Sequence, residues 1–137
     1  MAVKEIVHDE KFLSAPSRMA EKADRGIGTD LKDTLVANRS RCVGMAANMI
    51  GQQVRVIVAD IGGRPVVMYN PQIVGASDAY DTDEGCLSLE GMRKARRYRR
   101  IEVSYIDSLW QRKRKRFADF EAQIIQHEID HLNGIII

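Results

Sequence analysis

The alternation of apolar and polar residues predicts a chain built largely from antiparallel strands. Residues 101–107 alternate in this way, which is the period of a strand with one buried face. Two apolar runs flank Gly62 and Gly63, a pair that is typical of a hairpin turn. Asn70 and Pro71 predict a second turn, and the polar stretch at residues 77–83 predicts a loop. The predicted strands cover residues 54–59, 65–69, 72–74, 101–107 and 110–117.

Two other segments have the spacing of helices. After a glycine-bearing joint, Thr29 and Asp30 supply a predicted N-cap for a helix over residues 30–38. A second helix is predicted to begin near Asp119, because apolar residues recur there every three or four positions up to a stop signal at residues 133–134. The length of the chain predicts a single domain over residues 1–137. The architecture expected from these antiparallel strands and helices is of the α+β class.

Composition narrows the class of protein further. The chain of 137 residues is 45% hydrophobic and 29% charged, an ordinary balance for a globular domain. Its net charge of +2 is too small by itself to imply a polyanionic partner. No apolar run is long enough to span a bilayer, and the charged N-terminus predicts no export signal. We therefore expect a cytoplasmic protein without a membrane partner, whose two cysteines, Cys42 and Cys86, stay reduced.

The candidate metal-binding and catalytic side chains are concentrated in the second predicted helix, where residues 127–131 read His-Glu-Ile-Asp-His. Residues four apart lie on one face of a helix, so His127 and His131 can direct two imidazoles at one metal ion. Glu128 can then act as a general base toward water at that ion. Cys86, in a glycine-bearing segment, offers a third ligand and leaves a fourth position open, as in catalytic sites. The plainer alternative is an amphipathic helix with two surface histidines.

These segments resemble the signatures of the peptide deformylases, the hydrolases that remove the formyl group from the N-formylmethionine of new bacterial polypeptides. The family's EGCLS segment is complete at residues 84–88, and its QHExDHL helix is complete at residues 126–132. The third signature, GxGxAAxQ, is altered at residues 42–49, where Cys42 replaces the first Gly and Met49 replaces the Gln. The resemblance implies small antiparallel β-sheets packed around a central metal-binding helix.

The resemblance also implies a metal and a substrate. One divalent transition metal would be held by Cys86, His127 and His131, with Glu128 as the general acid–base. Resemblance favours Fe²⁺, and Zn²⁺, Ni²⁺ or Co²⁺ are the expected replacements, since this ligand set suits several such ions. The substrates would be N-formyl-Met peptides or nascent chains.

Two donors stabilise the oxyanion in the family, namely the backbone N–H at the position of Leu87 and the side chain of the motif Gln. Met49 stands at the second position and cannot donate a hydrogen bond, which predicts a lower rate. Asn48 has an amide, but it is one methylene shorter than Gln and would have to point to the other side of the chain.

The resemblance also implies which residues bind the substrate and which support the metal site. Val43 and Gly44 would pair with the substrate backbone as an added strand, beside Met49. Arg93 is predicted to pair with Glu84 and so to support the cysteine-bearing segment.

Three functional hypotheses follow. The first is a deformylase, with activity reduced by Met49. The second is an impaired deformylase-like protein that binds metal and formylated or Met-led peptides. The third uses the eleven Lys and Arg residues between Arg93 and Arg116, which could lie along ribosomal RNA and predict a weak ribosome association.

Overall fold

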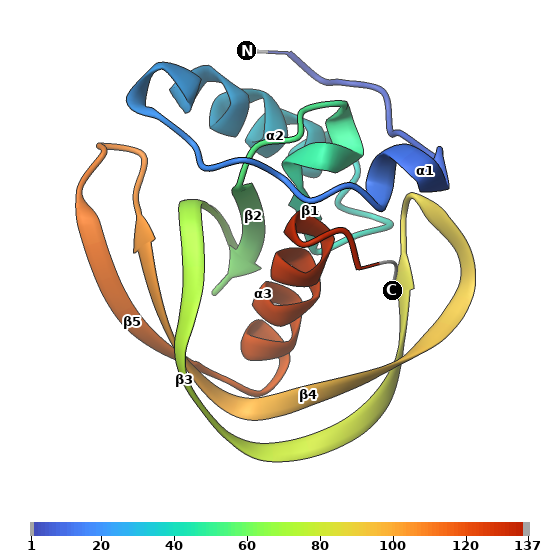
Figure 1. Ribbon diagram of the computed structural model, residues 1–137, viewed down its shortest axis with the longest axis vertical. Coiled ribbons are helices and arrows are strands. Elements are labelled where there is room, and N and C mark those ends of the chain that lie inside the picture. Colours follow the sequence, from blue (N-terminus) through green and yellow to red (C-terminus); the bar gives the residue numbers. More distant parts are fainter. Residues whose placement is uncertain (1, 136–137) are drawn as a thin grey trace.

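The computed structural model describes residues 2–135; Met1, Ile136 and Ile137 of the predicted domain lie outside the described residues. One five-stranded antiparallel sheet, with strand order β1-β2-β3-β4-β5, curves around a central helix (Figure 1). This confirms the α+β class, although the strands form one sheet where small sheets were expected. The elements in chain order are α1 (Glu10–Leu13), the 3-10 turn η1 (Lys22–Asp24), α2 (Arg25–Ala37), β1 (Gly44–Ala46), the 3-10 turn η2 (Ala47–Ile50), β2 (Val56–Ile61), β3 (Arg64–Cys86), β4 (Leu89–Ile106), β5 (Arg112–Ala118) and α3 (Asp119–Leu132).

The two longest strands, β3 and β4, differ most from the sequence-based prediction. The chain does not turn at Asn70 and Pro71 but continues through a register shift between Tyr69 and Gln72, with Asn70 at φ 52°. The predicted loop at residues 77–83 is also strand, and it pairs with residues 94–100 of β4. Its polar residues face solvent opposite cations of β4, and such cross-strand pairs of opposite charge stabilise a sheet. Polarity at residues 77–83 therefore marks an exposed face and not a loop.

The short strands at the other side of the sheet agree better with the sequence. Gly62 and Gly63 form the β2–β3 hairpin turn, and both have the positive φ that this tight turn requires. β1 pairs with β2 alone, in the register Gly44 opposite Ala59. β1 is therefore an edge strand, and one side of its backbone has no strand partner among the described residues.

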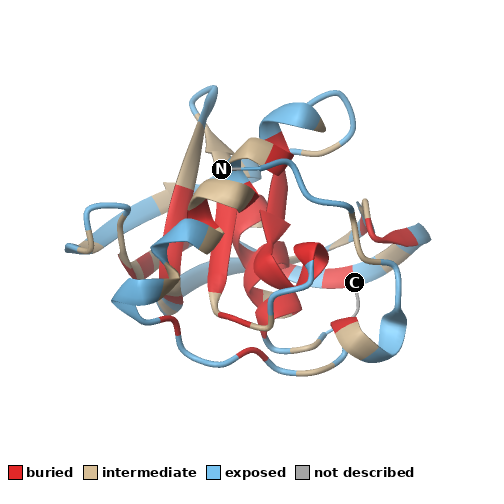
Figure 2. Cartoon of the chain, turned by 90° about the horizontal axis from the view of Figure 1, so that it is seen from above, coloured by how far each residue is buried: buried red, intermediate tan, exposed pale blue. Residues whose placement is uncertain are grey.

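Two clusters of buried side chains hold the helices on the sheet. Ile125 and Leu132 of α3 are fully buried against Ile57 and Val103. α2 packs Leu31 and Leu35 into a second cluster. The buried segments gather in the middle of the molecule, with the exposed parts of the strands outside them (Figure 2). The core thus lies inside the curve of the sheet, with α3 at its centre.

The helix predicted over residues 30–38 is longer at its N-terminal end, since α2 begins at Arg25. The glycine joint is part of this helix. A Cβ at Gly28 would collide with the hydroxyl of Tyr69, so the glycine allows α2 to approach the sheet closely. Tertiary packing here outweighs the low helix propensity of glycine. No helix in the described part of the chain is long and apolar enough to cross a membrane.

Candidate active site

α3 is fixed to the sheet by Gln126, so its histidines have a defined position. The Gln126 side chain accepts a hydrogen bond from the Tyr98 N–H and donates one to the Tyr98 carbonyl, both at 2.8 Å. Acidic residues in the first turn of α3 suit the positive end of the helix dipole. His127 and His131 both lie on the buried side of the helix, which excludes the alternative of two surface histidines.

The three predicted metal ligands meet at one point. Cys86 ends β3, and its thiol and one nitrogen from each of His127 and His131 lie within 4.8 Å of one another. The two imidazole rings have centroids 4.8 Å apart. One sulfur and two imidazole nitrogens could hold a single transition-metal ion with a position left open.

Glu84 orients the first of these histidines. Its Oε1 lies 2.7 Å from Nδ1 of His127. Burial alone would raise the pKa of Glu84, but hydrogen bonds from His127, Arg97 and Gln123 outweigh burial and lower it to about 2. Glu84 therefore stays ionised and accepts the Nδ1 proton, which leaves Nε2 of His127 available to a metal.

Arg97 is the arginine that supports Glu84. Its guanidinium donates two hydrogen bonds to Glu84, at 2.7 and 2.9 Å, and a third to Asp130 of α3 at 2.7 Å. The predicted pair between Arg93 and Glu84 is wrong. Although Arg93 lies opposite Glu84 in the strand register, the Glu84 carboxylate contacts His127 and Arg97 beneath α3, and Arg93 extends outward to Glu10 at 3.3 Å.

Without a metal, His127 holds a proton strongly. Burial would lower its pKa, but hydrogen bonds with Cys86 and Glu84 outweigh burial and raise it to about 10. An incoming metal ion must displace this proton, so metal binding here is coupled to proton release.

Glu128 is buried beside the edge strand. Burial raises its pKa to about 7, only partly offset by His127. Its Oε1 has no hydrogen-bond partner among the described residues. A Cβ at Gly44 would lie 3.0 Å from Glu128 Oε2 and 2.6 Å from Ile124, so this close approach of β1 and α3 depends on the glycine. A carboxyl group with a pKa near neutrality suits proton transfer.

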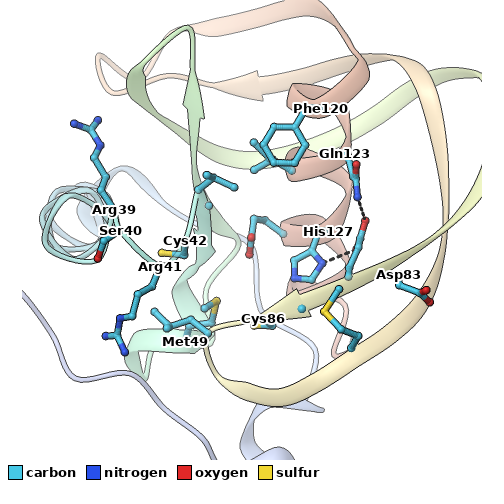
Figure 3. A pocket seen from close by; sticks show the side chains of 18 of the residues that line it. Arg39, Ser40, Arg41, Cys42, Met49, Asp83, Cys86, Phe120, Gln123 and His127 are labelled. Atoms are coloured by element: carbon cyan, nitrogen blue, oxygen red, sulfur yellow. Dashed lines mark hydrogen bonds and ion pairs between the residues drawn. The ribbon is translucent and has the colours of Figure 1, made fainter.

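A cavity of about 640 Å³ lies over these residues (Figure 3). Nine residues singled out from the sequence line it: Cys42, Val43, Gly44, Met49, Glu84, Cys86, Leu87, His127 and Glu128. The sequence did not single out other lining residues, including Arg39, Arg41, Met92, Phe120 and Gln123. Of these, only Gln123 carried a usable signal, because it lies one helical turn before His127. The other lining residues reach the cavity only through the packing of separate helices, strands and connecting segments.

The altered first signature places no amide donor in this cavity. Met49 is buried, and its Sδ accepts a hydrogen bond from the Ala46 N–H at 3.4 Å. The Asn48 amide points elsewhere and donates to the His131 carbonyl at 2.9 Å. Asn48 therefore does not replace the missing glutamine. Cys42 lines the cavity as a free thiol whose pKa is raised by burial to about 11, so it is neutral at physiological pH.

Two imidazoles one helical turn apart, a sulfur ligand and a buried glutamate beside an edge strand define a site of the metallohydrolase class. Comparison with known proteins identifies the family. A model of the polypeptide deformylase family matches residues 3–137. The chain belongs to the peptide deformylase family.

The individual relatives agree with this assignment. A peptide deformylase of Clostridium beijerinckii is 50% identical over 135 residues, which cover 98% of this chain and 99% of that protein. The solved structure of the class I type b peptide deformylase from Acinetobacter baumannii bound to Met-Ala-Ser has a TM-score of 0.88 at 26% identity, and the match covers 99% of this chain and 97% of that one. The peptide deformylase from Ehrlichia chaffeensis in complex with actinonin has a TM-score of 0.87 at 32% identity, covering 98% and 86%.

Proposed function

We propose that this protein is a metal-dependent hydrolase that removes the N-formyl group from formyl-methionine at the start of nascent polypeptides. Its family membership supports this reaction. The observation that carries the proposal is the meeting of Cys86, His127 and His131 beside a cavity that is lined by Cys86, His127 and the buried Glu128. The cavity is of the size that small ligands occupy in proteins.

We infer that Cys86, His127 and His131 hold one divalent transition ion. The donor set fits such an ion, because a thiolate with two imidazoles suits metals of intermediate softness. Fe²⁺ is the favoured ion, with Zn²⁺, Ni²⁺ or Co²⁺ as replacements. When bound, the ion supplies Lewis acidity that polarises the formyl carbonyl and makes water more acidic.

Glu128 is proposed to move the proton. It takes a proton from the attacking water while the water oxygen bonds to the formyl carbon. It then passes this proton to the amine nitrogen as the carbon–nitrogen bond breaks, which releases formate and a free N-terminal methionine. Support comes from its burial and from a pKa raised to about 7, which allows both directions of transfer.

The oxyanion of this reaction is proposed to have one protein donor, the backbone N–H of Leu87. Met49 offers none, and loss of one such donor typically lowers the rate by about 10²–10³. We therefore propose an enzyme with reduced activity. The second candidate, a protein that binds metal and formylated or Met-led peptides without turning them over, is favoured by this same observation at Met49.

The substrate is proposed to lie along β1. The open edge of this strand supports pairing of the peptide backbone with Val43 and Gly44, which is how extended peptides add to sheets. We also infer a site of action in the cytoplasm, where nascent chains emerge. Weak ribosome association would be carried by the cations of β5, such as Arg112 and Arg116, and would fall as salt rises.

The direct experiment is formate release from formyl-Met-Ala-Ser by anaerobically purified, iron-loaded protein. We expect measurable turnover that is lost in Glu128→Gln while the iron content stays the same. Metal-loaded wild-type protein that binds Met-Ala-Ser but releases no formate would instead support the binding protein.

A further inference from the structure

An unpaired positive charge lies on the rim of the cavity, in the segment that leads from α2 into β1. Arg39 and Arg41 both line the cavity and both are exposed. Arg39 is neutralised by Asp60 at 3.1 Å. Arg41 donates only to the neutral amide oxygen of Asn38, at 2.6 Å, and within residues 2–135 it forms no ion pair with a carboxylate.

The position of Arg41 relative to β1 determines which part of a bound peptide its charge can contact. It precedes Gly44 by three residues, and Gly44 packs directly against Glu128. An extended chain rises about 3.3 Å per residue, so the backbone of Arg41 lies within about 10 Å of Gly44. A peptide paired with β1, with its formyl end at Glu128, would bring its next two residues past Arg41.

The cavity rim is positively charged on the side of Arg41 and negatively charged on the opposite side. Figure 3 shows Arg39 and Arg41 on one side of the cavity and Asp83 on the other. A carboxylate on the bound peptide is therefore attracted to the arginine side and repelled from the Asp83 side. A guanidinium also matches a carboxylate in shape, since two of its N–H groups can donate in parallel.

We propose that Arg41 makes this site selective for formylated peptides that carry a carboxylate side chain two positions after the formyl-methionine. This inference rests on the proposed function and names its substrate class more narrowly. The contact is solvent-exposed, so its effect is modest: an acidic residue is favoured about two- to fivefold over its amide, the size of an exposed ion pair.

The test compares three amidated peptides, formyl-Met-Ala-Glu, formyl-Met-Ala-Gln and formyl-Met-Ala-Lys. The amide removes the terminal carboxylate, so the third side chain carries the only difference in charge. We expect kcat/KM to fall in the order Glu, Gln, Lys, and the spread to narrow at high salt because exposed charges are screened. Arg41→Gln should remove the preference for Glu over Gln, and Arg41→Glu should reverse it toward Lys.

Arg25→Gln is the matched control, since it makes the same change of charge at the exposed first residue of α2, outside the cavity lining. It should keep the wild-type order. Dissociation constants of the deformylated peptides, measured in parallel, make the result independent of turnover. Equal binding of the three peptides to wild-type protein, or an unchanged preference in Arg41→Glu, overturns the inference about Arg41. Selective binding with no formate release from any peptide supports Arg41 and contradicts the proposed function instead.

Discussion

Oε1 of Glu84 lies 2.7 Å from Nδ1 of His127, and both side chains are buried. This bond joins the end of β3, which carries Cys86, to the helix that carries both histidines. It fixes which ring nitrogen of His127 remains for a metal. The relative position of two of the three candidate ligands, Cys86 and His127, thus depends on a carboxylate outside the candidate set.

Replacing Glu84 should weaken metal binding. Glu84→Gln removes the charge that holds the Nδ1 proton, and loss of such a supporting partner typically lowers metal affinity by about 10- to 100-fold. Competition with a chelator measures this directly. Asp81→Asn, an exposed change on the same strand, is the control and should leave affinity unaltered. Equal affinities for all three proteins would mean that His127 is oriented without Glu84.

Two arginines of β4, Arg93 and Arg97, should differ sharply in their effect on stability. Arg97→Met removes the guanidinium from the buried carboxylate of Glu84 and from Asp130, and breaking a buried pair in this way costs about 3–5 kcal/mol. Arg93→Met removes only an exposed pair with Glu10, worth about 1 kcal/mol or less. Urea unfolding of the metal-free variants gives both values. Similar losses in the two variants would contradict the structural difference between them.

Stability should fall in acid because of Glu84. Its pKa is lowered from 4.5 to about 2 in the folded protein, so folding favours the charged carboxylate. Its contribution to the free energy of unfolding is complete above about pH 4.5 and is lost as the pH falls toward 2. The stability difference between metal-free wild type and Glu84→Gln should therefore shrink between pH 6 and pH 3. A difference that stays constant over this range would exclude Glu84 as a source of the acid sensitivity.

Two glycines should respond in opposite ways to alanine. Gly44→Ala places a Cβ 2.6 Å from Ile124 and 3.0 Å from Glu128 Oε2. Such overpacking costs about 1–3 kcal/mol, and it should also lower activity by displacing Glu128. Gly26→Ala in α2 meets no atom within 4 Å and should stabilise the protein by about 0.5–1 kcal/mol through helix propensity. Thermal unfolding with formate assays separates the two; an active, stable Gly44→Ala protein would show that β1 has room there.

The sequence predicted well the features that depend on neighbouring residues. It predicted poorly those that depend on contacts between separate strands and helices. α3, its end at Asn133 and the Gly62–Gly63 hairpin were correct because spacing within a few residues determines them. The side chains of Cys86, His127 and His131 lie together as predicted because their signatures are complete. The continuity of β3 was missed, since its polar residues are explained only by the cations of β4 across the sheet.

The choice of arginine shows the same limit. Strand alternation places Arg93 and Arg97 on one face, so the sequence alone cannot tell which of them reaches Glu84. Asp130 and Gln123 of α3 decide it, because they complete a buried set of partners around Glu84 and Arg97. The role of Arg41 on the cavity rim likewise depends on the meeting of the α2–β1 segment with β3 and α3.

The most direct test of the account is the Met49→Gln variant. If the site is a deformylase site that lacks one oxyanion donor, a glutamine of nearly the same length as Met49 should supply it. We predict that kcat/KM for formyl-Met-Ala-Ser rises by about 10-fold or more, up to the ~10²–10³ that one donor is worth, with metal content unchanged. Adding Glu128→Ala should abolish the gain. An unchanged kcat/KM in metal-loaded Met49→Gln would contradict the account, because the missing donor would then not limit this site.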